Sequence, residues 1–410
     1  MKEPFFEPHF RRLRAYIAIC EAGTLYKASE QVHLAPSSLT RMVQELERTL
    51  AVELFERTGR RMVPTESGRV LAAGARRILA YLDEAEQELE AGENTQAEPP
   101  RLFSHRLTHR QLRALIDVAR HHSMSEAARQ QKLSQPAVAM AIRDLEQVVE
   151  TPLFYRTSSG MTLTEQGEVL LRYAKLAFAE SNAIADEISA RSGELDGRVV
   201  IGALPQSGAL LIPRAVNMLL TEHPKLRVSV MDGTYDALLQ GLLCGEVDII
   251  VGGLRFPVPE EIRYEQLFVD KLVCVVRSSH PLAQRTGRLE MRHAQGFEWV
   301  IPRRGTPARE QVDAMLARAQ VGVGNQYIES NSLHLIRGLL MESDRVAIIS
   351  QCQVQLEVEM GMLTILPLVI HEGGTPIGIR TRAVNEWPIG TQKLISCLRQ
   401  VSGGLNSMQR

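Results

Sequence analysis

Residues Leu13–Gly68 hold the pattern on which the architecture depends, and they read LRAYIAICEAGTLYKASEQVHLAPSSLTRMVQELERTLAVELFERTGRRMVPTESG. A gapless shift of 99 residues carries this stretch onto Leu112–Gly167, which reads LRALIDVARHHSMSEAARQQKLSQPAVAMAIRDLEQVVETPLFYRTSSGMTLTEQG. Leu46-Glu47 returns as Leu145-Glu146, and Leu54-Phe55 returns as Leu153-Phe154. A match of this length without a gap indicates a duplicated unit.

Each copy has the pattern of three short helices followed by a β-hairpin. In the first copy, apolar residues from Leu13 to Cys20 recur at helical spacing, and Thr24 is placed to cap a second helix. A third helix follows Pro36, with an apolar face formed by Leu39, Val43, Leu46 and Leu50. The segments LFE and MVP, on either side of RTGRR, predict two short strands around a turn, which is the wing of a winged helix-turn-helix.

A long helical pattern rich in Ala, Leu and Glu follows each hairpin, over Thr65–Glu90 and Thr164–Ser192. The segment 93–106 between the copies is polar and contains Pro-Pro, which is typical of a linker. The two long helices are able to pair within one chain or with those of another chain. We expect domains at 8–92, 107–193 and 196–402, with 93–106 as the linker.

The third helix of the first copy has the composition of a DNA-reading helix. Such a helix lies in the major groove, where base edges are distinguishable. Its polar face and the wing supply hydroxyl, amide and guanidinium groups for bases and phosphates, namely Ser37, Ser38, Thr40, Arg41, Gln44, Arg57, Arg60 and Arg61. The alternative is a module used only for packing, with arginines that are merely solvated.

The pattern changes after Gly193 to alternating strands and helices. Arg198–Gly202 is a buried-strand run, Arg227–Met231 and Asp248–Val251 are further strands, and helical segments separate them. This alternation favours a parallel α/β sheet.

Both copies resemble the DNA-binding domain of LysR-type transcriptional regulators, whose usual core reads roughly SQPAVSRQIRRLE followed by LFxR and LTxxG. The resemblance implies two α-rich winged helix-turn-helix domains, each with a long linker helix, and then a two-lobed α/β effector domain of the periplasmic-binding-protein-like kind. The lobes would comprise about 196–268 with 367–402, and about 269–366. It further implies a bacterial regulator that is cytoplasmic and nucleoid-associated. Such a regulator would bind double-stranded promoter DNA and a small-molecule effector, form a homo-oligomer (dimer or tetramer) and have RNA polymerase as a further partner.

The two copies depart from the family pattern differently. The Gln that opens the family's recognition helix is Pro36 in the first copy and is retained as Gln135, followed by Pro136, in the second. Thr40-Arg41 becomes Ala139-Met140, and Arg60-Arg61 becomes Ser159-Gly160. The second copy keeps Gln135, Arg143 and Arg156 as candidate contacts. We therefore expect the first copy to be the main DNA reader, and the second to be a weaker reader or a structural partner.

Candidate effector residues lie at strand-to-helix turns. The resemblance places Gln206, Ser207 and Thr234 in the effector cleft, and Gly253 permits close approach of backbone to ligand. In the second lobe, Arg303, Arg304 and Thr306 form a turn whose guanidinium groups can pair with a carboxylate, which suggests an aromatic or sugar acid. The alternatives are helix capping for the hydroxyls and simple solvation for the arginines.

Composition narrows the competing functions. The net charge of −1 means that DNA binding requires a local basic patch, and the five cysteines show no metal-ligand spacing. No signal-peptide pattern, membrane-length apolar run, metal motif, cofactor motif or enzyme motif stands out, so we expect no enzyme. The remaining rivals are a thiol switch based on Cys274 and Cys352, and a non-regulatory small-molecule binding protein.

Overall fold

The computed structural model describes most of the residues of the chain. They are Glu7 and the ranges 9–58, 61–92, 104–158, 160–191, 195–205, 207–286, 289–322, 326–368, 374–384 and 386–408. No helix within these ranges is long and apolar enough to span a membrane.

The first copy folds as three helices and a hairpin. Thr24 caps the second helix by accepting a hydrogen bond from the backbone N–H of Lys27, and Pro36 occupies the first turn of the third, where its missing N–H costs nothing. The elements are α1 (Phe10–Ala22), α2 (Leu25–Gln31), α3 (Pro36–Leu50), β1 (Phe55–Thr58) and β2 (Arg61–Pro64).

The second copy repeats this arrangement element by element. Thr108, Ser123 and Ser134 cap its three helices through their side-chain oxygens. The elements are α5 (His109–His121), α6 (Met124–Gln131), α7 (Gln135–Val149), β3 (Phe154–Thr157) and β4 (Gly160–Leu163). The repeat in sequence is therefore a repeat in local structure.

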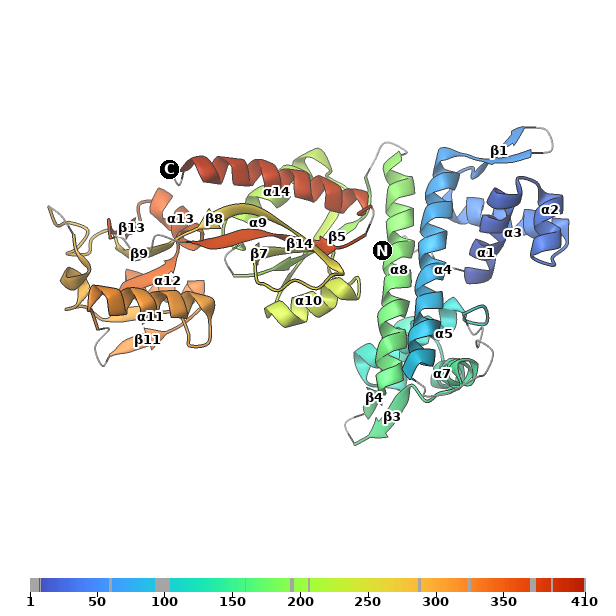
Figure 1. Ribbon diagram of the computed structural model, residues 1–410, viewed down its shortest axis with the longest axis horizontal. Helices are drawn as coiled ribbons and strands as arrows, with labels where there is room; N and C mark the ends of the chain where they lie inside the picture. The colour runs from blue at the N-terminus through green and yellow to red at the C-terminus, as the bar shows by residue number, and fades with distance from the viewer. Residues whose placement is uncertain are drawn as a thin grey trace.

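The long helices α4 (Glu66–Gly92) and α8 (Glu165–Arg191) lie side by side and antiparallel (Figure 1). Ion pairs that link them fix this register: Arg191 contacts Glu66 and Arg172 contacts Glu88 near the ends, and Arg77 Nη2 lies 2.7 Å from Glu180 Oε1 between them. Of the two pairings that the sequence left open, the structure has the one within a single chain.

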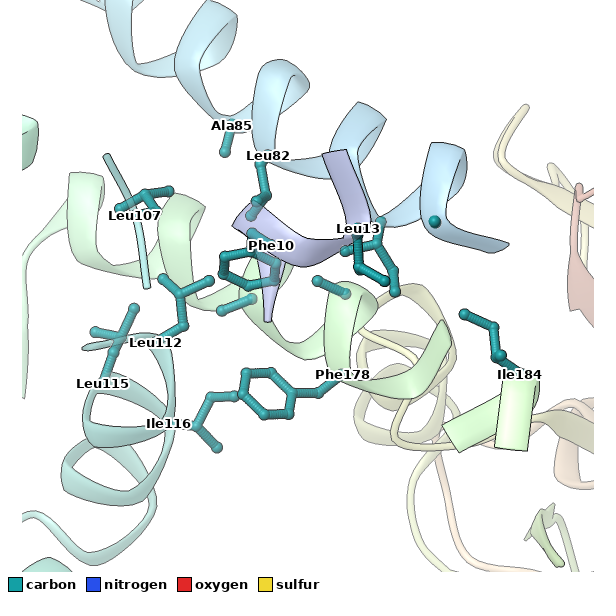
Figure 2. Close-up of a cluster of buried hydrophobic side chains, with 14 of the residues drawn as sticks. Phe10, Leu13, Leu82, Ala85, Leu107, Leu112, Leu115, Ile116, Phe178 and Ile184 are labelled. Carbon is teal, nitrogen blue, oxygen red and sulfur yellow. The ribbon is translucent and has the colours of Figure 1, made fainter. Parts of the chain in front are cut away.

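One hydrophobic core runs through both copies and the helix pair. Figure 2 shows Phe10 of α1 close to Leu82 of α4, with Leu112 of α5 and Phe178 of α8 completing the cluster. All four side chains are at most 6% exposed. Burying side chains of this size contributes about 1.5–3 kcal/mol each, so the two copies and the helix pair stabilise one another.

The C-terminal part contains two five-stranded mixed sheets of the same topology. The strand orders are β6-β5-β7-β14-β8 and β11-β10-β12-β9-β13, and in each the first three strands are parallel and the fourth runs against them. We call the two units the first and second lobes. The chain passes from the first to the second at Lys271 and returns after β13.

The elements of the first lobe are β5 (Arg198–Ala203), α9 (Leu211–Glu222), β6 (Arg227–Asp232), α10 (Tyr235–Leu243), β7 (Ile249–Gly253), β8 (Ile262–Asp270), β14 (Thr375–Arg382) and α14 (Ile389–Met408). Those of the second are β9 (Leu272–Arg277), η1 (Met291–Ala294), β10 (Trp299–Ile301), α11 (Pro307–Ala319), β11 (Tyr327–Glu329), α12 (Leu333–Met341), β12 (Val346–Ser350), α13 (Gln351–Glu359) and β13 (Leu363–Ile365). Figure 1 shows the first lobe next to α8, on the side away from the first copy.

Candidate DNA-binding and effector-binding sites

Helix α3 divides into a buried face and an exposed polar face. Leu39, Val43 and Leu46 are buried, whereas Ser37, Arg41 and Gln44 are exposed, as the helical spacing predicts. Arg41 has an anionic neighbour on the same helix, because its Nε lies 3.5 Å from Glu45 Oε1. A mobile surface pair of this kind is weak and leaves the guanidinium available to a stronger anion.

Two of the predicted hydroxyls on α3 are less available. Ser38 and Thr40 are half-buried, and Thr40 Oγ1 donates a hydrogen bond to the carbonyl of Pro36 at 3.0 Å. A hydroxyl keeps acceptor capacity in that arrangement, so it can still accept from an amino group but is not a free donor.

A groove of about 700 Å³ runs between α3, the start of α2 and the hairpin of the first copy. Its lining includes Thr40 and Gln44 from α3 and Arg61 from β2. Arg61 is exposed, so its guanidinium group offers a positive charge on the hairpin side of α3. Arg60 and the side chain of Arg57 lie outside the described residues.

The second copy presents a more apolar face. Gln135, Pro136, Arg143 and Arg156 are all exposed. Met140, which stands where the first copy has Arg41, is 58% exposed, and Arg143 Nε donates to the carbonyl of Ala139 at 3.4 Å. Ser159, the counterpart of Arg60, lies outside the described residues.

In the first lobe, the candidate effector residues have structural partners. Ser207 is fully buried, and its Oγ contacts the carbonyls of Leu204 at 2.8 Å and Val251 at 2.7 Å. Thr234 caps α10 by accepting from the N–H of Ala237, yet it stays exposed. Gly253 is buried at the carboxyl end of β7, and Gln206 lies outside the described residues.

An aromatic and guanidinium cluster that no sequence motif indicated lies at the same edge of the first sheet. The guanidinium carbons of Arg255 and Arg380 each lie 4.9 Å from the ring centroid of Tyr235. Arg380 is fully buried, and it donates to the carbonyls of Gly253 and Arg255 at 3.2 Å. The one available signal was a charged residue inside the apolar strand pattern IGIRT.

In the second lobe, the predicted turn is held by side-chain contacts. Thr306 caps α11 by accepting from the N–H of Arg309, and the backbone N–H of Arg303 donates to Asn331 Oδ1 at 3.1 Å. Arg304 is exposed and contacts the Tyr327 hydroxyl at 3.2 Å. Arg303 is exposed, so its guanidinium faces solvent.

A direct contact joins the lobes close to the predicted site. Gln353, near the start of α13, donates to the carbonyl of Pro205 at 3.3 Å. Pro205 lies two residues after the end of β5 and directly before the predicted residue Gln206. Sequence reasoning did not find Gln353, because α13 has no motif and the contact arises from the way the two lobes meet.

The cysteines have the properties of inert thiols. Burial raises the pKa of Cys274 to about 12 and that of Cys20 to about 11, and burial together with Asp270 raises the pKa of Cys352. Since the thiolate is the reactive form, a raised pKa disfavours a redox switch.

Two family profiles match the chain. The profile described as "LysR substrate binding domain" matches residues 192–402. The profile described as "Bacterial regulatory helix-turn-helix protein, lysR family" matches twice, at residues 10–69 and 109–168. Together they cover most of the chain.

Relatives share this arrangement to different extents. The HTH-type transcriptional regulator GalR of Pseudomonas putida is 34% identical over 395 residues, which is 96% of this chain and 97% of that protein. The HTH-type transcriptional regulator PcaQ of Agrobacterium fabrum is 30% identical over 307 residues, 74% of this chain and 98% of that protein. The first match therefore extends over both copies, while the second leaves about a quarter of the chain unmatched.

Solved structures show the same fold. Full-length OxyR from Pseudomonas aeruginosa, in a variant form, superposes with a TM-score of 0.56 at 21% identity, covering 72% of this chain and 95% of that chain. CbnR, a LysR family transcriptional regulator, gives a TM-score of 0.51 at 20% identity, covering 72% and 98%. The chain belongs to the LysR-type transcriptional regulators, DNA-binding proteins controlled through a substrate-binding domain.

Proposed function

We propose that the first copy is the principal DNA reader and that the second copy is a weaker reader or a structural partner. The exposed set Ser37, Arg41, Gln44 and Arg61 supports this proposal, because Met140 replaces the arginine at the equivalent place in the second copy. An exposed thioether contributes no charge for a phosphate or a guanine edge.

The helix pair supports a reading unit made from one chain. Helices α4 and α8 each have 27 residues, so they are about 40 Å long. The hairpins of the two copies lie at opposite ends of this pair (Figure 1), although the starts of α1 and α5 meet between them. That separation is comparable to one turn of DNA, about 34–36 Å, the usual spacing between half-sites.

The experiment compares charge-removing variants of the full chain on the DNA upstream of its own gene. Deleting the first copy would expose the shared core, so substitutions are used instead. The first pair is the double variant Arg41→Ala and Arg61→Ala in the first copy, and the second pair is Arg143→Ala and Arg156→Ala in the second copy. We expect the first pair to lose most of the affinity and to reduce the salt slope by about 2, one per phosphate contact. The control is Arg318→Ala, which is exposed on α11 in the second lobe.

The outcome assigns the roles of the copies. Footprints that shorten only with the second pair, or equal losses from both pairs, contradict the proposal that the first copy dominates. Loss with the first pair alone makes the second copy a structural partner, whereas a smaller loss with the second pair makes it a weaker reader.

We further propose that the two lobes enclose a carboxylated effector, such as an aromatic or sugar acid. Arg255 follows β7 in the first lobe and Arg303 follows β10 in the second, so both guanidinium groups lie beyond the carboxyl ends of parallel strands, and Arg255 also contacts the ring of Tyr235. Closure of lobes of the periplasmic-binding-protein-like kind on such a ligand would change how the lobes press on the helix pair.

Thermal unfolding with pairs of ligands tests the effector class. Aromatic and sugar carboxylates should raise the melting temperature, whereas the matching neutral amides should not, because guanidinium groups select the carboxylate. Arg255→Ala and Arg303→Ala should remove the shift. Equal stabilisation by acids and amides would rule out carboxylate recognition.

We also propose the domain boundaries, the cellular location and the partners that follow from membership of this family. Residues 8–92 and 107–193 would act as tandem winged helix-turn-helix units joined by 93–106, and residues 196–402 as the effector domain, with lobes at about 196–268 with 367–402 and at about 269–366. The protein would act in the cytoplasm at the nucleoid, with RNA polymerase as a further partner and with no catalysis of its own. Because the surfaces of α4 and α8 already pair within the chain, a homo-oligomer would use other surfaces.

A further inference from the structure

Three potential metal ligands meet where the two copies touch. Glu7 and His9 precede α1, and His109 begins α5. The imidazole rings of His9 and His109 lie edge to face, with centroids 4.2 Å apart. A carboxylate oxygen of Glu7 lies 3.2 Å from His109 Nε2.

The donor set and its spacing fit a transition-metal ion. One ligand atom from each of the three residues can be chosen so that all lie within 4.8 Å of one another. Ligand atoms around a tetrahedral Zn²⁺ are bound at about 2.0–2.2 Å, and so lie about 3.4 Å apart. Small side-chain rotations close this difference, because Glu7 is exposed and both histidines are only partly buried.

We propose that Glu7, His9 and His109 form a binding site for a divalent transition-metal ion such as Zn²⁺. Two imidazoles and one carboxylate leave a fourth position for water, as in other three-ligand zinc sites. Imidazole selects such ions over Mg²⁺ and Ca²⁺, which prefer oxygen ligands.

Positive charge near the site opposes binding of a cation, so we expect a bound ion to exchange with solvent. Arg12 and Arg110 are the nearby cations that oppose a metal ion, although Arg12 is already paired with Glu45. The partial positive charge at the starts of α1 and α5 opposes it as well.

The site depends on the divergence of the two copies. The shift that relates them carries the three ligands onto positions that hold no such set, because the equivalents are Arg106, Thr108 and Phe10. Among the described residues this set therefore occurs once, with two ligands just before α1 and one at the first residue of α5. A bound ion would tie the starts of α1 and α5 together and stabilise the shared core against unfolding. Sequence analysis expected no metal site, since the ligands are a hundred residues apart.

The test is a Zn²⁺ titration of the metal-stripped full-length protein by calorimetry, with thermal unfolding in parallel. We expect one Zn²⁺ per chain and a rise in melting temperature. His9→Asn and His109→Asn should each weaken binding by at least about tenfold, since even loss of an outer-shell partner costs about 10–100-fold. The matched control His334→Asn removes an exposed histidine of the second lobe and should leave binding unchanged.

Co²⁺ as a second probe separates this site from binding by cysteines. Nitrogen and oxygen ligation gives visible bands without the near-ultraviolet thiolate band, and both histidine variants should lose those bands. The melting temperature without metal shows whether each variant is folded. A thiolate band, equal affinity in the His109→Asn variant, or no saturable binding by the wild-type protein would overturn the proposal.

Discussion

Glu47 and Glu146 make the same hydrogen bond at equivalent positions in the two copies. Glu47 Oε1 accepts from the N–H of Leu54, and Glu146 Oε1 accepts from the N–H of Leu153, both at 2.9 Å. Each bond fixes the turn between the third helix and the hairpin. A hydrogen bond to a charged group contributes about 1.5–3 kcal/mol, which is enough to set the position of a short wing.

Replacing Glu146 with alanine should therefore lower the free energy of unfolding by about 1–3 kcal/mol. Glu146→Gln should cost less, because its amide oxygen can still accept from Leu153. Urea denaturation of the full chain measures both, with Asp144→Ala on the exposed face of α7 as the control. This role of Glu146 would be contradicted if Asp144→Ala lowered the free energy of unfolding as much as Glu146→Ala does.

Asp186 gives stability a specific dependence on pH. Burial raises its pKa from the ordinary value of 3.8 to about 7, although the N–H of Arg198 partly offsets this. The folded protein thus holds the Asp186 proton more tightly than the unfolded chain does. Its contribution is complete below pH 4 and is lost as the pH rises through about 7.

The variant Asp186→Asn should be more stable than the wild type at pH 8 and should differ less from it at pH 5. Asparagine stays neutral and can still accept from Arg198. Urea midpoints at the two pH values measure this, and Asp144→Asn, at an exposed aspartate of α7, is the control. The assignment would be contradicted if the urea midpoint fell by the same amount between pH 5 and pH 8 in the wild type and in Asp186→Asn.

At the scale of elements, the α4–α8 pair depends on a close approach at Gly74. A Cβ atom at this position would lie 2.3 Å from Cγ1 of Ile184, a residue that is 1% exposed. The equivalent residue in the second copy is Tyr173, whose hydroxyl donates to Glu88 at 2.9 Å. The helix pair is therefore asymmetric, with tight packing on one side and polar contact on the other.

Gly74→Val should separate the helices and lower the free energy of unfolding by roughly 1–3 kcal/mol, which is the usual cost of overpacking. Ala73→Val adds the same branched side chain on the exposed face of α4, so it controls for helix propensity. Thermal and urea unfolding compare the two. Equal effects would mean that the approach at Gly74 is not what limits packing.

At the scale of the whole molecule, the first lobe rests on α8, the long helix of the second copy. Lys175 Nζ lies 3.0 Å from Glu246 Oε1, and Gly245 approaches Ala179 of α8. A Cβ atom at Gly245 would be 2.9 Å from Cβ of Ala179. The first lobe is thus in direct contact with one member of the α4–α8 helix pair.

Gly245→Ala should weaken this contact and make the effector domain unfold separately from the N-terminal part. Gly245 has a φ of +73°, so part of the cost is backbone strain. Gly361→Ala is the matched control, because Gly361 has a φ of +71° with nothing within 4 Å of the added atom. We expect two calorimetric transitions for Gly245→Ala only. A single cooperative transition in both variants would show that the contact does not couple the parts.

Local structure and family membership follow from the sequence. The cap at Thr24, the buried face of Leu39, Val43 and Leu46, and the long helices after each hairpin are confirmed within a residue or two. The LysR-type family is confirmed by both profiles. These features depend on neighbours a few residues apart, which helical periodicity and side-chain capping record directly.

Contacts between distant segments were decided only by the tertiary structure. The sequence did not show that α4 pairs with α8 of the same chain, or that Arg380 reaches Tyr235. The family resemblance placed Ser207 in the effector cleft, with a structural role for its hydroxyl as the alternative, and the fold buries that hydroxyl against the carbonyls of Leu204 and Val251. The physical reason is that a repeat specifies identical surfaces without specifying their partners. Packing of the whole core then selects which surfaces meet and which polar groups remain exposed.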